Sequence, residues 1–252
     1  MNTAKAVDGL FFSYYEDIDR WHNDHAPGRP TGAPARLSDA SDEGGRSILA
    51  RTARQGVSID GQLMDVARFF SRVAHGATTE YRRYDAFSLT HLSGAYYESL
   101  AARHGYQVLH VNHASRVDFA SLAEAYSPRC IFLSSTFFTE IANLVDAMQH
   151  LRAAWPGVPI VVGGLFLVEI SKAVQGAPFQ ALLSTFDADA YVVSALGEAA
   201  LLKVLARDGD GLEGLDLPQS WVRDGRGYRW CETAEPGLAI DENFVRWDEI
   251  SA

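Results

Sequence analysis

The chain has 252 residues, of which 47% are hydrophobic and 21% charged, so it can fold around an ordinary core without structural metals or disulfides. Its 32 acidic residues outnumber the 22 basic ones, and the net charge of -10 argues against nucleic acid as a partner. Its sequence shows neither a signal peptide nor a run of about 18 apolar residues. We therefore expect a soluble, cytoplasmic protein without a membrane partner.

The N-terminal part of the chain predicts one strand, one loop and one helix. Residues 7–14 form a short apolar and aromatic run that is typical of a buried first strand. Residues 16–60 begin with a segment rich in Pro and Gly, which predicts an inserted surface loop. Residues 62–74 carry apolar side chains at steps of three and four, which predicts an amphipathic helix.

From residue 94 onward, predicted strands and helices alternate. We predict strands at 106–112, 130–135, 159–164 and 190–195, and helices at 94–104, 118–126, 139–155, 167–174 and 197–207. Nearly continuous apolar strands separated by helices pair in parallel through right-handed crossovers. Together with the first strand, the pattern predicts a doubly wound α/β domain over residues 1–207. Its five-stranded parallel sheet is flavodoxin-like or Rossmann-like, with a ligand crevice at the carboxyl ends of the strands.

The C-terminal part, residues 208–252, is less regular. The sequence SWVRDGRGYRWCE predicts a small hairpin around Asp224 and Gly225, because an Asp-Gly pair suits a tight hairpin turn. We interpret the tail that follows as a connector.

Small residues follow three of the predicted strands. They are Ser134, Ser135 and Thr136 after the third strand, Gly163 and Gly164 after the fourth, and Ser194 and Ala195 after the fifth. Small side chains at neighbouring strand tips allow a large ligand to approach the backbone, where hydroxyl and amide groups can bind it. Ordinary tight turns are the alternative for each residue taken alone.

The motifs HLSGAYYESLAARHGYQVLHVN, CIFLSSTF, PIVVGG and DADAYVVSALGEAALLKVL occur in that order. This order resembles the cobalamin-binding domain that precedes the barrel of cobalamin-dependent radical SAM enzymes. That family commonly has VVRGEGE in the last segment. Here VVSALGE keeps Gly197 and Glu198 and replaces the Arg-Gly pair. The resemblance covers about residues 7–207.

The resemblance implies that a corrin lies on the strand tips, with its nucleotide tail in the crevice. The cofactor-binding residues that it implies are His91, Ser93, Gly94, Ser134, Ser135, Thr136, Gly163, Gly164, Ser194, Gly197 and Glu198. A structural role at the start of a helix is the alternative for Glu198. The aromatic run of Phe11, Phe12, Tyr14 and Tyr15 is core or one wall of the crevice, and only Tyr14 or Tyr15 is placed to reach outward.

His91 is the candidate cobalt ligand. The segment from His91 to Gly94 precedes a helix at the place where corrinoid methyltransferases and mutases carry Asp-x-His-x-x-Gly, whose His ligates cobalt. Leu89 stands at the Asp position, so the carboxylate that would orient the imidazole is missing. Cobalamin-dependent radical SAM proteins usually lack this motif, and a histidine without a ligand role is therefore the alternative.

By resemblance, the chain belongs to a methylcobalamin-dependent radical SAM enzyme, a methyltransferase in natural product biosynthesis that acts on a small molecule or peptide. Such enzymes hold an iron-sulfur cluster with three closely spaced cysteines. Cys130 and Cys231 lie 101 positions apart and cannot do so. We therefore expect no catalysis by this chain alone, and a barrel that binds the cluster and SAM to be supplied in cis or in trans.

Two alternatives remain open from the sequence. One is a stand-alone corrinoid carrier or sensor, or a ligand-free interaction module on the same fold. The other is a flavin or nucleotide binder, which is disfavoured because no Gly-x-Gly-x-x-Gly motif follows the first strand.

Overall fold

The computed structural model describes residues 4–13, 57–59, 62–64, 91–112, 114, 117–138, 140–194, 196–225, 227–234 and 236. The chain divides into two compact units, Met1–Glu16 with Thr90–Ala252, and Asp17–Leu89. In the second unit, β3 (Val57–Ile59) and β4 (Gln62–Met64) form an antiparallel pair. The helix predicted at 62–74 is therefore wrong at its first three residues, and β3 lies in the expected loop. The rest of both predictions lies outside the described residues.

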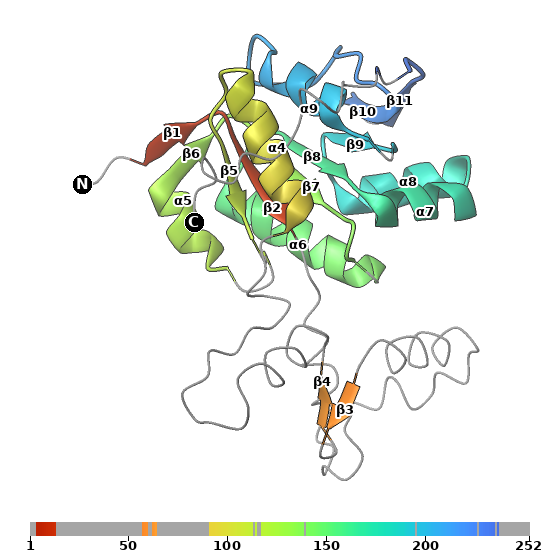
Figure 1. The fold of residues 1–252 in the computed structure, drawn as a ribbon. Helices are drawn as coiled ribbons and strands as arrows, with labels where there is room; N and C mark the ends of the chain where they lie inside the picture. Colours follow the sequence, from red (N-terminus) through yellow and green to blue (C-terminus); the bar gives the residue numbers. More distant parts are fainter. Residues whose placement is uncertain are drawn as a thin grey trace. The chain divides into compact units, whose positions relative to one another are not determined.

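The first unit is built on a seven-stranded sheet with the order β11-β10-β9-β8-β7-β2-β5 (Figure 1). Its strands are β2 (Gly9–Ser13), β5 (Val108–Val111), β7 (Ile131–Ser134), β8 (Ile160–Gly163), β9 (Ala190–Val192), β10 (Ser220–Asp224) and β11 (Gly227–Cys231). The five neighbouring strands β5, β2, β7, β8 and β9 pair in parallel, as predicted. The predicted five-stranded sheet is too small, because the hairpin β10-β11 pairs antiparallel with β9 and extends it.

Strand order identifies the edge of this sheet at which doubly wound proteins bind their ligands. The five parallel strands lie side by side in the order β5-β2-β7-β8-β9. If they are numbered along the chain, this spatial order is 2-1-3-4-5, which is one of the two common doubly wound orders. The connections therefore leave the first strand, β2, in opposite directions, and the switch point lies between β2 and β7. Outside this sheet, β1 (Lys5–Val7) pairs in parallel with β6 (Tyr126–Pro128), a contact that the sequence did not predict.

Helices cover both faces of the sheet. The first face packs against α5 (Phe119–Ala125), α6 (Ile141–Ala154), α7 (Leu165–Ala173) and α8 (Ala177–Phe186). The second face packs against α4 (Leu92–Arg103), which crosses in front of β2 in Figure 1, and α9 (Glu198–Leu205). Helix α8 was not predicted from the sequence. No helix in the described ranges is both long enough and apolar enough to cross a membrane.

Local sequence explains where several helices begin and end. Asp118 caps α5, because its carboxylate accepts hydrogen bonds from the backbone amides of Ala120 and Ser121 at 3.1 and 3.4 Å. Gly105 follows α4 with a φ of 81°, a left-handed conformation that glycine adopts without strain.

Candidate functional site

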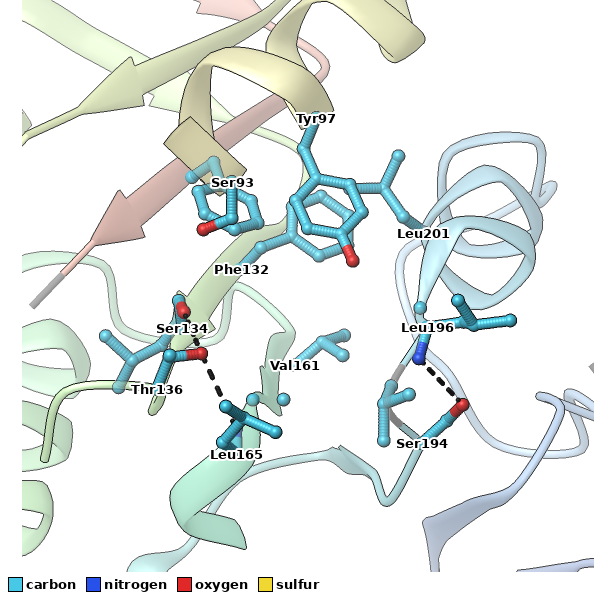
Figure 2. Close-up of a pocket in the computed structure, with 16 residues that line it drawn as sticks. Ser93, Tyr97, Phe132, Ser134, Thr136, Val161, Leu165, Ser194, Leu196 and Leu201 are labelled. Atoms are coloured by element: carbon cyan, nitrogen blue, oxygen red, sulfur yellow. Dashed lines mark hydrogen bonds between the residues drawn. The ribbon is translucent and has the colours of Figure 1, made fainter. Parts of the chain in front are cut away.

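A pocket opens at the carboxyl ends of the parallel strands, on the face covered by α4 and α9 (Figure 2). The empty space between its walls is about 680 Å³, including the part that is open to solvent. Seven of the eleven residues implied by the resemblance line it, namely Ser93, Ser134, Thr136, Gly163, Gly164, Ser194 and Gly197. The sheet edge expected from the strand order therefore carries a pocket.

The floor of the pocket consists of two rows of strand residues. Side chains alternate along a strand, so residues two apart share a face. We call Ser134, Gly163 and Val192 the outer row, because they pair side by side at the strand ends. We call Phe11, Phe132 and Val161 the inner row, because they pair two residues further inside. Small residues of the outer row leave the entrance open, and rings and a branched side chain of the inner row close the far end.

Tyr97 of α4 and Leu201 of α9 cover the inner row. In Figure 2 both side chains point toward the space over Phe132. The Tyr97 ring stacks on Phe11, with ring centroids 5.0 Å apart and an interplanar angle of 28°. Phe11 stacks in turn on Phe132, at 6.4 Å and 24°. Phe11 is therefore both a core residue and part of the pocket wall. The sequence had suggested Tyr14 or Tyr15 for the wall, and both lie outside the described residues.

Hydroxyl groups gather at the mouth of the pocket. Ser134 donates a hydrogen bond from Oγ to Thr136 Oγ1 at 3.3 Å. The same Thr136 oxygen accepts the backbone amide of Leu165 at 3.5 Å (Figure 2). On the opposite side of the mouth, Ser194 Oγ accepts the amide of Leu196 at 3.1 Å. These bonds fix the loops after β7, β8 and β9 and hold hydroxyl groups at the entrance.

The two adjacent glycines at the end of β8 have different roles. Gly164 has a φ of 111°, and a Cβ there would lie 2.7 and 2.8 Å from the backbone nitrogens of Thr136 and Ser135. Only glycine fits this turn without a shift of backbone. A Cβ at Gly163 would meet Val192 at an ordinary 3.6 Å. Gly163 therefore keeps the pocket open without being required by the backbone.

Two of the implied cofactor-binding residues have structural contacts away from the pocket. Ser135 is fully buried and its Oγ accepts the backbone amide of Leu167 at 3.2 Å. Gly94 packs directly against the ring of His110, where a side chain would clash. Neither residue lines the pocket. Both positions stay predictions as ligand contacts, although the structure gives each of them a packing role.

Glu198 also lies outside the lining. It holds in place the loop between β9 and α9, which we call the mouth loop. Its Oε2 accepts the backbone amide of Gly197 at 2.8 Å. Burial raises the pKa of the Tyr96 hydroxyl, and the hydrogen-bonded Glu198 carboxylate raises it further. Glu198 therefore links the start of α9 to α4, in addition to its favourable position at a helix N-terminus.

His91 lies at the N-cap position of α4, at the same end of the sheet as the pocket, but does not line it. Its backbone amide donates to Asn112 Oδ1 at 3.1 Å, and its ring meets Phe137 edge-on with centroids 4.8 Å apart. Its Nδ1 forms a hydrogen bond of 2.8 Å with Ser93 Oγ. A hydroxyl is thus the partner of this imidazole where corrinoid methyltransferases have a carboxylate. Cobalt ligation by His91 stays a prediction.

The apolar half of the pocket was not predicted from the sequence. It consists of Tyr97, Phe132, Leu133, Val161, Leu165, Val192, Leu196 and Leu201. Two signals in the sequence point to some of them. Phe132 is two residues before Ser134 on a strand and therefore shares its face. Tyr97 is four residues after Ser93 on a helix, and residues four apart lie on the same helix face.

The two cysteines are core residues. Cys130 and Cys231 are free and buried. Burial raises the pKa of the Cys130 thiol to about 11, so it stays protonated at neutral pH and is a poor metal ligand. Within the part of the chain that the structure describes, no three His, Cys, Asp or Glu side chains group to hold a metal.

No protein-family model, curated protein or solved structure matches the chain. What is established is an α/β protein with a mostly parallel sheet and a pocket at the carboxyl edge of that sheet. The geometry of the pocket and the motif order of the sequence are therefore the features that bear on function.

Proposed function

We propose that this chain binds a corrinoid at the carboxyl edge of its sheet, as the cobalamin-binding domain of a radical SAM enzyme. The observation that carries the proposal is the open pocket between α4 and α9, with small side chains in its outer row. Ligands of doubly wound sheets bind outside the carboxyl ends of the strands, near the switch point. The pocket includes Ser134 at the end of β7, one of the two strands that flank this switch point.

The residues of the pocket fit the nucleotide tail of a cobalamin. Gly163 keeps the entrance free of side-chain atoms, and the apolar inner row closes the far end of the pocket. The hydroxyls of Ser134, Thr136 and Ser194 at the mouth suit the polar ribose and phosphate. The corrin itself would lie over the strand tips. Bound methylcobalamin would supply a methyl group.

The radical SAM part of the proposal requires a second domain. Both cysteines of this chain are buried, so a cluster would have to be held by a barrel that is supplied in cis or in trans. The proposed enzyme is a methyltransferase that acts on a natural product or a peptide. A closely spaced cysteine triad encoded downstream or in a neighbouring gene would support this assignment, and a corrinoid-binding chain without such a partner would favour a carrier or sensor.

One observation favours a ligand-free module as the second candidate. The Arg-Gly pair of the family pattern is replaced, and Ser194 at the mouth accepts the amide of Leu196, whose side chain is 49% exposed. An exposed leucine at the mouth suits a protein contact as well as a corrin face.

Titration of the purified chain with hydroxocobalamin separates these candidates. We expect a saturable change in the visible spectrum and co-elution of the corrinoid with the protein. An unchanged spectrum together with separate elution would remove corrinoid binding and leave the interaction module.

A further inference from the structure

Exposed apolar side chains gather at the carboxyl edge of the sheet. Among the described residues, six large hydrophobic side chains are exposed, and all but Trp230 of β11 follow a parallel strand or begin a helix at this edge. They are Leu92, Phe137, Ile141, Leu165 and Leu196, with exposed fractions of 62%, 42%, 42%, 52% and 49%. We call these five residues the apolar rim.

The apolar rim extends beyond the pocket. Leu165 and Leu196 belong to the pocket lining (Figure 2), whereas Leu92, Phe137 and Ile141 do not. Leu92 and Ile141 are the first residues of α4 and α6. The ring of His91, which precedes Leu92, meets the Phe137 ring at 4.8 Å, so the start of α4 lies beside the loop after β7. A ligand in the pocket does not account for these three exposed side chains, and grouped apolar side chains on a surface mark a contact site.

The same edge carries carboxylates. Asp118 and Glu140 precede α5 and α6, Glu198 begins α9, and Glu232 follows β11 where that strand ends at this edge. Asp118, Glu140 and Glu232 are exposed. The helix N-termini offset part of this negative charge, at roughly half a unit each, and leave the edge net negative.

The basic side chains of the surrounding helices do not balance these carboxylates. Arg103, Arg152 and Lys203 lie in the last turns of α4, α6 and α9, which end at the opposite edge of the sheet. Lys172 of α7 is paired with Glu169, with 2.7 Å between Nζ and Oε1. The surface around the apolar rim is therefore acidic.

We propose that the apolar rim docks a segment of a partner polypeptide in which apolar side chains are flanked by lysine or arginine. Burial of the rim side chains supplies affinity, and the carboxylates around them select a cationic border. Nucleic acid and anionic membranes would meet like charge at this edge. A second copy of the chain would bring the same carboxylates together. The inference goes beyond the proposed function and does not depend on corrinoid binding.

Synthetic peptides test the chemistry of the partner on the unmodified, corrinoid-free chain. Fluorescence anisotropy measures binding of a labelled amphipathic peptide of leucine and lysine. One matched peptide has glutamate in place of lysine, and another has serine in place of leucine. We expect the leucine-lysine peptide to bind at least about tenfold more tightly than either. Binding of either matched peptide as tightly as the leucine-lysine peptide overturns the proposal, as does failure of all of them to bind.

Substitutions assign the binding to the apolar rim. We expect the double variant Leu92→Ser with Ile141→Ser to bind the leucine-lysine peptide at least about tenfold more weakly, because two apolar contacts are lost. Trp230→Ser, which removes an exposed apolar side chain away from the rim, is the control and should bind normally. Normal binding by the double variant overturns the proposal. Thermal melting shows whether each variant folds.

A pair of charge substitutions tests the acidic border and also decides the case in which the double variant does not fold. Glu140→Gln should weaken binding of the leucine-lysine peptide by roughly two- to fivefold at low salt. Glu124→Gln removes an exposed carboxylate near the end of α5 and should have no effect. Equal binding by these two variants overturns the role of the border.

Two further measurements test the other occupants. Sedimentation would assign the apolar rim to a second copy if the unmodified chain dimerised and the double variant did not. Flotation with phosphatidylglycerol vesicles would assign it to a membrane if the unmodified chain bound the vesicles and the double variant did not. Either result overturns the proposal.

Discussion

The phenol ring of Tyr97 on α4 stacks on the ring of Phe11 on β2, with centroids 5.0 Å apart. This contact joins α4 to β2 beside the pocket, which both residues line. Tyr97 therefore has two functions, since it packs α4 on the sheet and forms part of the pocket wall. The same side chain connects the stability of the fold with the shape of the site.

Substitution of Tyr97 tests both functions. Tyr97→Ala removes a half-buried ring, and we expect a loss of about 2 kcal/mol in the free energy of unfolding. We also expect hydroxocobalamin to bind at least about tenfold more weakly, because the wall over the inner row is lost. Tyr97→Phe keeps the ring and is the control. Urea denaturation and absorbance titration measure the two effects, and tight binding by Tyr97→Ala would show that this wall does not contact the ligand.

Filling the pocket at Gly163 should abolish binding without unfolding the protein. A Cβ at this position meets Val192 at 3.6 Å, so the backbone accepts a side chain, and a leucine side chain extends into the pocket. We expect Gly163→Leu to melt within a few degrees of the wild type and to show no spectral change with hydroxocobalamin. Gly211→Leu, on an exposed loop where a Cβ would meet only the backbone nitrogen of Glu213 at an ordinary 3.9 Å, is the control and should bind normally. Normal binding by Gly163→Leu would place the ligand elsewhere.

Substitution of the neighbouring Gly164, unlike that of Gly163, should destabilise the fold. Gly164→Ala forces a Cβ to within 2.9 Å of Thr136 atoms at a φ of 111°, and we expect a loss of more than about 2 kcal/mol in the free energy of unfolding. Gly163→Ala, one residue earlier, should change the free energy by less than about 0.5 kcal/mol. Chemical denaturation of both variants measures the difference. Equal stability of the two would mean that the turn at Gly164 relaxes easily.

The sequence predicted the parallel strands because their apolar runs and the intervening helices are local patterns. It did not predict that β10 pairs with β9, where Ser220 lies opposite Val192. A hairpin sequence specifies its own turn, whereas the strand to which it is added depends on tertiary packing. The predicted sheet therefore had its five parallel strands and lacked its antiparallel edge.

The candidate site was predicted as a row of small residues, and the structure divides that row. Ser134 lines the pocket and Ser135 does not, because the Ser135 hydroxyl, one residue beyond the end of β7, accepts the backbone amide of Leu167 in the core instead. Gly163 and Gly164 could not be separated from the sequence either, since the difference between them depends on how closely the loop after β7 approaches.

The buried thiol of Cys130 predicts a loss of stability at high pH. Its pKa is raised from 9.0 to about 11 by burial, so the folded protein keeps the thiol protonated while the unfolded chain already releases the proton. The free energy of unfolding should therefore fall as the pH rises from about 9 to about 11, by up to about 3 kcal/mol from this group. Burial also raises the pKa of Tyr191, which acts in the same direction at higher pH.

Comparison with Cys130→Ala isolates the contribution of the thiol. The substitution leaves a small cavity in the second face of the core, and its cost should be independent of pH. Because only the wild type loses the contribution of the thiol, the stability difference between the two proteins should narrow by up to about 3 kcal/mol between pH 8 and pH 11. Urea denaturation across this range measures it. Parallel stability curves would mean that Cys130 titrates equally in the folded and unfolded states, and prompt reaction of the native thiol with a disulfide reagent at pH 8 would contradict its burial.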